Sequence, residues 1–467
     1  MKPTRKDQQS KKTETYKGVL ELLLLIGIIL LIPLFFAMRT SATSQPASPT
    51  QTITAPITAS ASEESATVKV QRPPACTFPL AQISTKESQP EEYTFSEPKV
   101  VLTAPQGNTY NLAEWLPDNQ QVLITEDLGN VDVGNDKPNQ QSISLYNPET
   151  GETKIIAFRG IRGAPPSWLP DLNAVVYPSL TFTDINRKAG TYKVTRQIWI
   201  SYGDPNSAQI LAEDLPQLLF AVKPGGGEML YLSDKKISKL DKSLKKFVTP
   251  SFDPAQWDYG KGRRDENPVS YDMVWQPGTS LVFLYSHAGG SANGGYTFIL
   301  DTNTGQICEL DLGGWASRAR WSLDGRYLAF ERSVVYVGLT NSTDLLVLDT
   351  TSGQLYTPIL TSLDMTREHV IDDFIWAPDS RHLLVVEHTR SQDVHSVPTE
   401  LYLVDFMADQ GIQILPEYNF FGAGGAPQNN LAWSPDGSKL LIRCPVGEIP
   451  NNVVEQICFI KVQRTGK

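Results

Sequence analysis

The sequence is poor in cysteine and histidine, with four and five residues respectively among 467. Four cysteines are too few for a disulfide-rich scaffold, and the absence of a CxxC pair argues against a structural zinc site. No HExxH, Walker A or GxSxG pattern occurs, and the nearest stretch, Gly289–Asn293, lacks the closing glycine of a nucleophile elbow. The common catalytic motifs are therefore missing, and we expect no cofactor.

The chain also lacks an excess of basic charge, because 41 Lys and Arg face 51 Asp and Glu, for a net charge of −10. A nucleic-acid-binding protein needs a basic surface to neutralise phosphates, so this class is excluded. The charge is unevenly distributed. Residues 1–17 carry a net charge of +4, so the remainder carries −14.

One long apolar run is present, at residues 18–38, and no charged residue lies between Leu22 and Met38. About 20 apolar residues in a helix span a bilayer, whereas a cleaved signal peptide has a shorter apolar region and a small-residue cleavage site. The basic flank should stay inside the cell. We predict a single-pass helix in the cytoplasmic membrane, with the N-terminus inside and the bulk of the chain outside the cytoplasm.

A spacer rich in Ser, Thr, Ala and Pro follows the apolar run. It is too poor in apolar residues to form a core and should be extended. The predicted organisation is a cytoplasmic basic tail at 1–17, a transmembrane helix at 18–38, a disordered stalk at 39–92 and a folded ectodomain at 93–467.

The ectodomain repeats one short pattern, in which an aromatic residue precedes a turn rich in Pro, Asp and Gly and then an apolar run. The copies begin at Trp115, Trp168, Val222, Trp275, Trp321, Trp376 and Trp433, with a mean spacing of 53 residues. A second hairpin pattern follows, as at 143–156, 297–310 and 345–358. Such turns connect antiparallel strands, so each unit should contain four strands, the first of which ends at the aromatic residue.

Four-stranded units of this length, unable to bury both faces alone, are typical of β-propeller blades. After Trp433 only two further strands fit before the chain ends, whereas residues 98–104 resemble an isolated outer strand. We expect this segment to complete the last blade and close the ring. The predicted fold class is all-β, a seven-bladed β-propeller of four-stranded antiparallel blades.

Residues 433–437 read Trp-Ser-Pro-Asp-Gly, and 321–325 and 376–380 differ from that pattern at one or two positions. Over residues 98–467 the chain resembles the WD40-like repeats of TolB-type propellers. The resemblance implies the fold more than the function, because related propellers occur in periplasmic envelope proteins, as accessory domains of prolyl peptidases and in a few lyases. The hydrolase domain of the peptidases has no counterpart in this sequence.

The repeated residues are best explained by structure. An aromatic residue at the same place in each unit should pack between neighbouring blades rather than stack on a carbohydrate. The turn aspartates should accept backbone N–H bonds within their turns. They are Asp118, Asp171, Asp324, Asp379 and Asp436.

Function is expected where the units differ, in the long loops on one face of the ring. These are residues 126–141, 180–196, 253–267, 287–295, 388–399 and 417–430. Aromatic residues in these loops could contact a ligand or pack over the blades. The ligand-binding candidates are Trp257, Tyr259, Tyr418, Phe420 and Phe421.

Asp127, Asp234, His287 and His388 lie at the same offset in four units and could in principle hold a divalent ion such as Mn²⁺. Equivalent positions in separate blades should be too far apart, so scattered surface residues are the better interpretation and no metal is predicted. Asp127, Asp132 and Asp136 could bind Ca²⁺, or form a solvated acidic loop.

Cys444 and Cys458 flank the predicted last hairpin and could form a disulfide outside the cytosol. Closing a loop of about 15 residues would contribute roughly 3 kcal/mol. The alternative is two free thiols. Cys76 and Cys308 have no evident partner.

Together these features predict a membrane-tethered, extracytoplasmic propeller. We expect it to be non-catalytic and to bind a protein, peptide or glycan partner through its loop face. One alternative is a metal-dependent enzyme such as a polysaccharide lyase, and another is a passive scaffold of the cell envelope.

Overall fold

The computed structural model describes residues 73–81, 83, 89–105, 108–128, 141–160, 164–186, 191–215, 218, 220–233, 236–241, 246–248, 270–287, 297–312, 315–334, 342–358, 369–389, 399–418, 420, 430–444 and 454–465. They belong to one compact unit, residues 69–467. Among them there is no α-helix, and the only helical segments are two 3-10 turns, η1 (Pro170–Leu172) and η2 (Pro205–Ser207).

Six antiparallel sheets of four strands each form in chain order, and we number them as blades 1–6. Blade 1 contains β3 (Thr109–Trp115), β4 (Val122–Asp127), β5 (Gln141–Tyr146) and β6 (Thr153–Arg159). Blade 2 contains β7 (Ser167–Leu169), β8 (Ala174–Asn186), β9 (Thr191–Ser201) and β10 (Gln209–Ala212). Blade 3 contains β11 (Phe220–Val222), β12 (Glu228–Ser233), β13 (Lys236–Asp241) and β14 (Lys246–Val248).

Blade 4 contains β15 (Ser270–Trp275), β16 (Leu281–His287), β17 (Thr297–Asp301) and β18 (Ile307–Glu309). Blade 5 contains β19 (Trp315–Trp321), β20 (Tyr327–Val334), β21 (Ser342–Asp349) and β22 (Leu355–Tyr356). Blade 6 contains β23 (His369–Trp376), β24 (His382–Thr389), β25 (Thr399–Asp405) and β26 (Gln410–Gln413). In the segment 180–196, expected to be a loop, residues 180–186 and 191–196 instead belong to the paired long strands β8 and β9.

The remaining sheet, which we call the closing sheet, joins the two ends of the ectodomain. It contains β27 (Leu431–Trp433), β28 (Lys439–Arg443) and β29 (Gln456–Thr465), and both β1 (Glu92–Phe95) and β2 (Lys99–Thr103) pair with β29. Lys99 lies opposite Phe459, so the predicted pairing of segment 98–104 is confirmed.

The number of four-stranded blades is six rather than the predicted seven, because the closing sheet has five strands. β29 is ten residues long, so β1 and β2 follow one another along it. Pro98 separates them, and proline has no N–H to donate to a ladder. At this break the N–H of Ser96 donates to the carbonyl of Lys461 at 2.9 Å.

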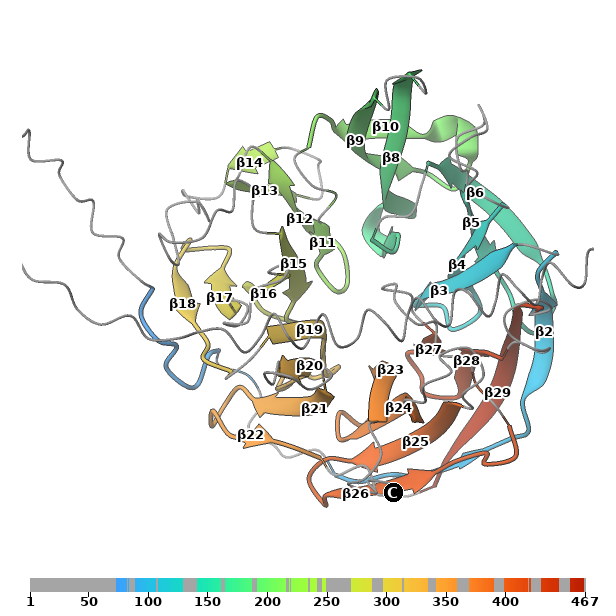
Figure 1. Cartoon of the computed structure of the whole chain (residues 1–467), viewed down its shortest axis with the longest axis vertical. Helices are drawn as coiled ribbons and strands as arrows, with labels where there is room; N and C mark the ends of the chain where they lie inside the picture. Colours follow the sequence, from blue (N-terminus) through green and yellow to red (C-terminus); the bar gives the residue numbers. More distant parts are fainter. Residues whose placement is uncertain are drawn as a thin grey trace, which may run out of the picture. The chain divides into compact units, whose positions relative to one another are not determined.

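Successive sheets pack face to face, and the closing sheet packs on blade 1 (Figure 1). Along β24, Leu384 and Val386 face the closing sheet, whereas Leu383 and Val385 face blade 5. A strand buried on both faces needs apolar residues at consecutive positions, which explains the uninterrupted apolar runs of the repeat. The chain is therefore an all-β propeller, as predicted.

The repeated tryptophans end the first strands, except Trp168, which lies one residue before the end of β7, and they pack between sheets, as expected. Three of them donate the indole N–H to the preceding sheet, at the residue just before that sheet's own aromatic residue. The bonds run from Trp115 to the carbonyl of Ala432 at 2.9 Å, from Trp321 to Val274 at 3.0 Å and from Trp376 to Arg320 at 2.8 Å. Trp275 and Trp433 donate within their own turns instead.

The turn aspartates also behave as predicted in four copies. Asp118 accepts the backbone N–H of Gln120 at 2.8 Å, and equivalent bonds reach Asp324, Asp379 and Asp436. In blade 2 the turn that contains Asp171 is the 3-10 segment η1, and Asn173 follows it with a φ of 48°. These bonds fix the short turns on one face of the ring.

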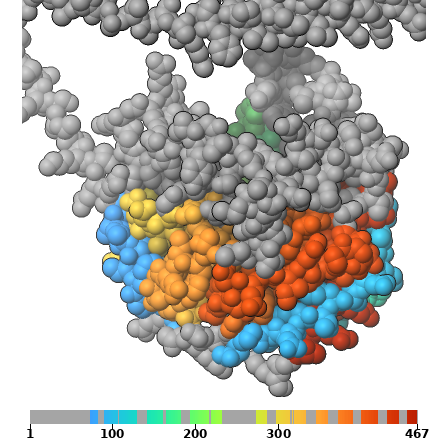
Figure 2. All heavy atoms as spheres, turned by 60° about the horizontal axis from the view of Figure 1, so that its bottom comes forward, coloured from blue at the N-terminus to red at the C-terminus, as the bar shows by residue number. Residues whose placement is uncertain are grey.

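The predicted stalk ends earlier than residue 92, because residues 73–81 already belong to the fold. Ala75 forms a parallel bridge with Glu309, and Cys76 forms a disulfide with Cys308. Figure 2 shows this segment in blue on the rim of the molecule, and β1 and β2 in light blue further along it. The sequence of this segment has no strand periodicity, because one isolated bridge, a backbone bond from Leu80 and the disulfide attach it rather than a ladder.

No helix in the described part of the chain has the length and apolarity of a membrane span. The predicted transmembrane segment 18–38, like the basic tail, lies outside the described residues.

Candidate functional site

Charged side chains gather on the first strands of blades 5 and 6, which face the centre of the ring. Arg320 of β19 forms an ion pair with Asp373 of β23, with Nη2 and Oδ1 3.0 Å apart, and also donates to the carbonyl of Phe374. Asp373 is fully buried, and its Oδ2 accepts the N–H of Asn430, just before β27, at 2.6 Å. One carboxylate therefore links blades 5 and 6 and the closing sheet.

The network continues into the closing sheet through Arg443, the last residue of β28, which is 1% exposed. Its guanidinium donates to Oδ1 of Asn430 at 3.0 Å and pairs with Glu455 at 2.8 Å. A buried charge is tolerated only when it is paired and hydrogen-bonded. These contacts therefore fix the position at which the chain leaves β28 on the loop face.

A second ion pair of the centre joins Arg318 to Glu331 at 3.1 Å. Burial lowers the pKa of Arg318, but the negative charges of Glu331, Asp373 and Asp372 outweigh it, so the pKa is raised. Arg318 therefore lies in the field of the aspartates of β23 as well as beside its own partner. We call these residues the inner charge network: Arg318, Arg320, Glu331, Asp372, Asp373, His388, Asn430, Arg443 and Glu455.

His388 lies near the end of β24, where the chain leaves blade 6 on the loop face. Its Nδ1 is 2.7 Å from Oδ2 of Asp372, and its side chain is 20% exposed, whereas that of Asp372 is 4% exposed. A carboxylate hydrogen-bonded to one ring nitrogen fixes the orientation of a histidine side chain. Of the network, His388, Arg318 and Arg320 are the members that retain some exposure.

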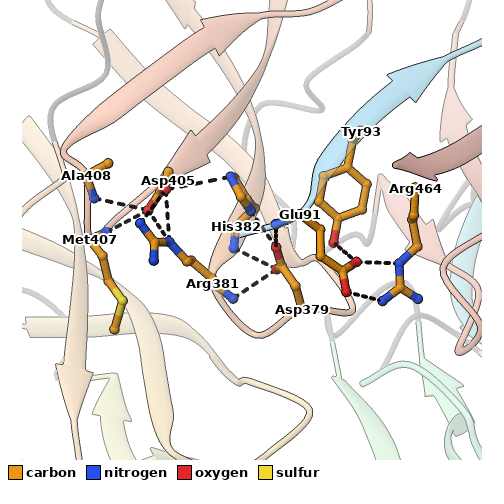
Figure 3. Close-up of polar contacts among 9 residues, drawn as sticks. All are labelled: Glu91, Tyr93, Asp379, Arg381, His382, Asp405, Met407, Ala408 and Arg464. Carbon is orange, nitrogen blue, oxygen red and sulfur yellow. Dashed lines mark hydrogen bonds and ion pairs between the residues drawn. The ribbon is translucent and has the colours of Figure 1, made fainter. Parts of the chain in front are cut away.

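A different cluster of charged side chains lies in blade 6 on the other face of the ring, the face that carries the short turns. Arg381 pairs with Asp405 at 2.9 Å, and Nδ1 of His382 is 2.6 Å from Oδ2 of Asp379 (Figure 3). Burial raises the pKa of Asp379, but hydrogen bonds from the ring and N–H of His382 and from the N–H of Arg381 outweigh it and lower the pKa. We call these four residues the turn cluster.

Strand β1 covers the turn cluster. The ring of Tyr93 contacts His382 edge-on at 5.6 Å between centroids and Trp433 at 5.5 Å. Glu91 pairs with Arg464, with Nη2 and Oε1 2.8 Å apart (Figure 3). Burial raises the pKa of Tyr93 well above its ordinary value, and the charges of Asp379 and Glu91 raise it further. The turn cluster therefore holds β1 in place.

The predicted ligand-contacting aromatics fall into two groups. Phe420 is 2% exposed and packs with Trp433 in the core between blade 6 and the closing sheet, and Tyr418 packs on the same core. Phe420 is therefore a core residue and not a surface residue, because its ring fills the space between two sheets. Trp257, Tyr259 and Phe421 lie outside the described residues.

Of the residues considered for a metal, the structure describes the side chains of Asp127 and His388, which bond to different partners in blades 1 and 6. Asp127 accepts hydrogen bonds from Thr109 at 2.9 Å and from Gln141, and His388 faces Asp372. Asp234, Asp132, Asp136 and the side chain of His287 lie outside the described residues. Within the described ranges, no three side chains of His, Cys, Asp or Glu form a group able to hold a metal ion.

All four cysteines form disulfides. Cys444 pairs with Cys458, the hairpin pairing considered from the sequence, and both sulfurs lie in the core beside the closing sheet. Cys76 pairs with Cys308 across 232 positions, which no sequence spacing could suggest. The inner charge network was also missed, and its only sequence signal is a charged residue close before the aromatic in a first strand, as at Arg320 and Asp373.

No protein-family model matches this chain, and no curated protein matches it either. Solved structures of β-propeller proteins resemble it at low identity. TolB from Acinetobacter baumannii is 13% identical with a TM-score of 0.38, covering 70% of this chain and 66% of its own. An oligogalacturonate lyase in complex with manganese is 10% identical with a TM-score of 0.47, covering 80% of this chain and 97% of its own.

A puromycin hydrolase is 10% identical with a TM-score of 0.41, covering 74% of this chain and 59% of its own. This chain therefore spans less than two thirds of the length of TolB and of the hydrolase. At these identities the likeness concerns the fold alone.

Proposed function

We propose that this protein is a non-catalytic propeller, tethered to the cytoplasmic membrane and exposed outside the cytoplasm, which binds a protein, peptide or glycan through its loop face. The observation that carries the proposal is that all four cysteines are paired in disulfides. Disulfides persist in oxidising compartments and are rare in the cytosol. The apolar run at 18–38 behind a basic tail supplies the tether.

Paired side chains at the strand ends from which the loops leave support recognition by the loop face. Asp127 is held by Thr109, His388 by Asp372 and Arg443 by Glu455, each where a strand meets the loop face. Paired groups at these positions fix where each loop starts and ends. Varied loops on a rigid scaffold are the usual place for a binding surface.

The location is tested with the full-length chain carrying, at residue 467, a reporter enzyme that is active only outside the cytoplasm. We expect reporter activity, and we expect all four cysteines to resist alkylation in intact cells until a reductant is added. A silent reporter together with four alkylated thiols would refute the location.

The binding surface is tested by crosslinking in native membranes, with mass spectrometry of the captured partner. The variant replaces residues 421–429 with a Gly/Ser linker of equal length, and the control replaces Pro148–Gly151, a short turn on the opposite face. We expect the partner to be lost from the first variant only. Equal capture by both variants would favour a passive scaffold.

A second candidate is an enzyme, because Asp372 orients the imidazole of His388 on the loop face, and an oriented histidine is a common general base. The enzyme considered from the sequence is a metal-dependent polysaccharide lyase. Metal analysis of the purified full-length chain separates the two candidates. Stoichiometric Mn²⁺ that is lost on His388→Ala would favour the enzyme, and a metal-free protein would favour the binding function.

A further inference from the structure

The N-terminal segment of the ectodomain runs along the rim of four sheets, and we call residues 73–81 and 89–103 the belt. It contacts β18 of blade 4 through Cys76, and its Leu80 N–H donates to the carbonyl of Thr350 in blade 5 at 2.9 Å. The N–H of Glu91 then reaches Asp379 of blade 6, before β1 and β2 pair with β29. The belt thus joins sheets that the ring already places in order.

The two ends of the belt are held very differently, and we call residues 73–81 the near end and residues 89–103 the far end. The far end is held by the ladders of β1 and β2, by Tyr93 against Trp433 and by the Glu91–Arg464 ion pair. The near end has two backbone bonds with Glu309, the bond from Leu80, and the disulfide. The ring of Phe78 lies against Gly353, yet Phe78 is 36% exposed. Leu80 and Ala81 also pack on the core of blades 4 and 5, so the disulfide is the covalent attachment of an end that otherwise has only non-covalent contacts.

The two disulfides also differ in exposure. Cys76 and Cys308 are both partly exposed on the rim. Cys444 and Cys458 are 7% and 4% exposed and lie in the core between blade 6 and the closing sheet. Thiol–disulfide exchange requires a thiolate to reach a sulfur along the S–S axis, so access decides which bond is reduced. We therefore expect a reductant to reach the rim disulfide more readily than the buried one.

We propose that Cys76–Cys308 is a reducible clasp that sets which blade carries the upstream chain. In exchange with a dithiol, one thiolate attacks a sulfur of the clasp and releases the other as a thiolate. The second thiol then resolves the mixed disulfide. Two electrons and two protons pass to the clasp, which becomes two cysteine thiols, while the dithiol becomes a disulfide.

With the clasp closed, whatever precedes residue 73 is attached at blade 4. With it open, the near end keeps only its non-covalent contacts. Once these are released the first attachment is Glu91, and the 15 residues from Cys76 to Glu91 provide up to about 50 Å of extra reach. Reduction would therefore move the place where the upstream chain is attached from blade 4 to the closing sheet. The loop face would then turn relative to the tether. The reorientation of the loop face rests on the proposed tether, whereas the selective reduction of Cys76–Cys308 does not.

The first test titrates the full-length oxidised protein with dithiothreitol, alkylates the free thiols and maps them by mass spectrometry. We expect Cys76 and Cys308 to be alkylated at a dithiothreitol concentration at least about tenfold lower than Cys444 and Cys458. Reduction of both pairs together, or of the buried pair first, would overturn the clasp.

The second test measures hydrogen exchange in Cys308→Ser against the oxidised wild type. We expect the amides of Cys76 and Leu80 to lose protection, and the amide of Thr94 in β1 to keep it. Unchanged protection at Cys76 would show that the disulfide does not hold the belt. Both tests use purified protein and do not depend on a membrane tether. Failure of the proposed location is detected separately, by the reporter fusion.

Discussion

At the scale of the residue, Glu114 is the clearest titratable group of the ring outside the inner charge network. It lies on β3 next to Trp115, is partly buried, and accepts the backbone N–H of Trp168 in blade 2. Burial raises its pKa to about 7, although the hydrogen bond from Trp168 lowers it. The junction of blades 1 and 2 therefore holds a carboxyl that titrates near neutrality.

Glu114→Gln should stabilise the protein at pH 8 by about 3 kcal/mol and change little at pH 4. The pKa in the fold, about 7, lies above the unfolded value of about 4.3, so the wild type loses stability as pH rises between these values. Glutamine keeps an oxygen for the N–H of Trp168 and removes the charge. Denaturant unfolding at both pH values measures this, with exposed Glu152→Gln as the control. An equal effect at both pH values would contradict the argument.

Asp349 should show the opposite pH dependence. Burial raises its pKa, but hydrogen bonds from Arg326 and Thr351 outweigh this and lower the pKa to about 2. Its contribution is therefore present above the unfolded pKa of about 3.9 and is lost as pH falls towards 2. Asp349→Asn should cost about 2 kcal/mol at pH 7 and progressively less below pH 4, as measured by denaturant unfolding. A cost that persists at pH 2.5 would exclude the ionised carboxylate as its source.

Four of the turn aspartates could be predicted from the sequence, because each bonds to residues two or three positions further on in its own turn. The central charges could not be predicted. Asp373 meets Arg320 and Asn430 of neighbouring sheets, and the first strands of blades 1, 5 and 6 contain register shifts at Leu112/Glu114, Ser317/Arg320 and Ile371/Asp373. A bulge breaks the alternation of faces, so the pattern no longer indicates which way a side chain points.

At the scale of the element, the tryptophan bond between sheets joins two first strands that share no ladder. Trp376→Phe removes the bond to Arg320 and should destabilise the protein by about 1 kcal/mol. It should also raise hydrogen exchange in β19, because the lost bond ends there. Trp275→Phe is the matched control, since its N–H bonds to Thr279 in its own turn and its loss should affect blade 4 alone. Unchanged exchange in β19 of Trp376→Phe would contradict the bridging role.

The strands of the blades could be predicted, because apolar runs between turns of defined chemistry leave little choice of register. β2 could be predicted for the same reason, since it reads as an outer strand without a blade. β1 was missed. It has four residues, Glu92–Phe95, and its attachment depends on Tyr93 and Glu91 meeting groups of blade 6 and the closing sheet. Such contacts exist only after the ring has formed.

At the scale of the whole molecule, the ring is closed by segments from both ends of the ectodomain. β27, β28 and β29 come from the C-terminal end, and β1 and β2 from the N-terminal end. The Cys444–Cys458 disulfide joins β29 to the residue that follows β28. Without the N-terminal strands, β29 would present an unpaired edge, and open edges favour association with other chains.

Two truncations test this closure. Deletion of residues 1–68 removes nothing that the compact unit contains, so its melting temperature should stay within about 2 °C of that of the full-length chain. Deletion of 1–104 removes β1, β2 and the clasp, and should lower the melting temperature by about 10 °C or more and produce oligomers. Deletion of 1–88 with Cys308→Ser keeps both strands and isolates their contribution, and should remain monomeric. Circular dichroism and light scattering measure these outcomes. A monomeric 105–467 chain of unchanged melting temperature would show that the ring closes without its N-terminal strands.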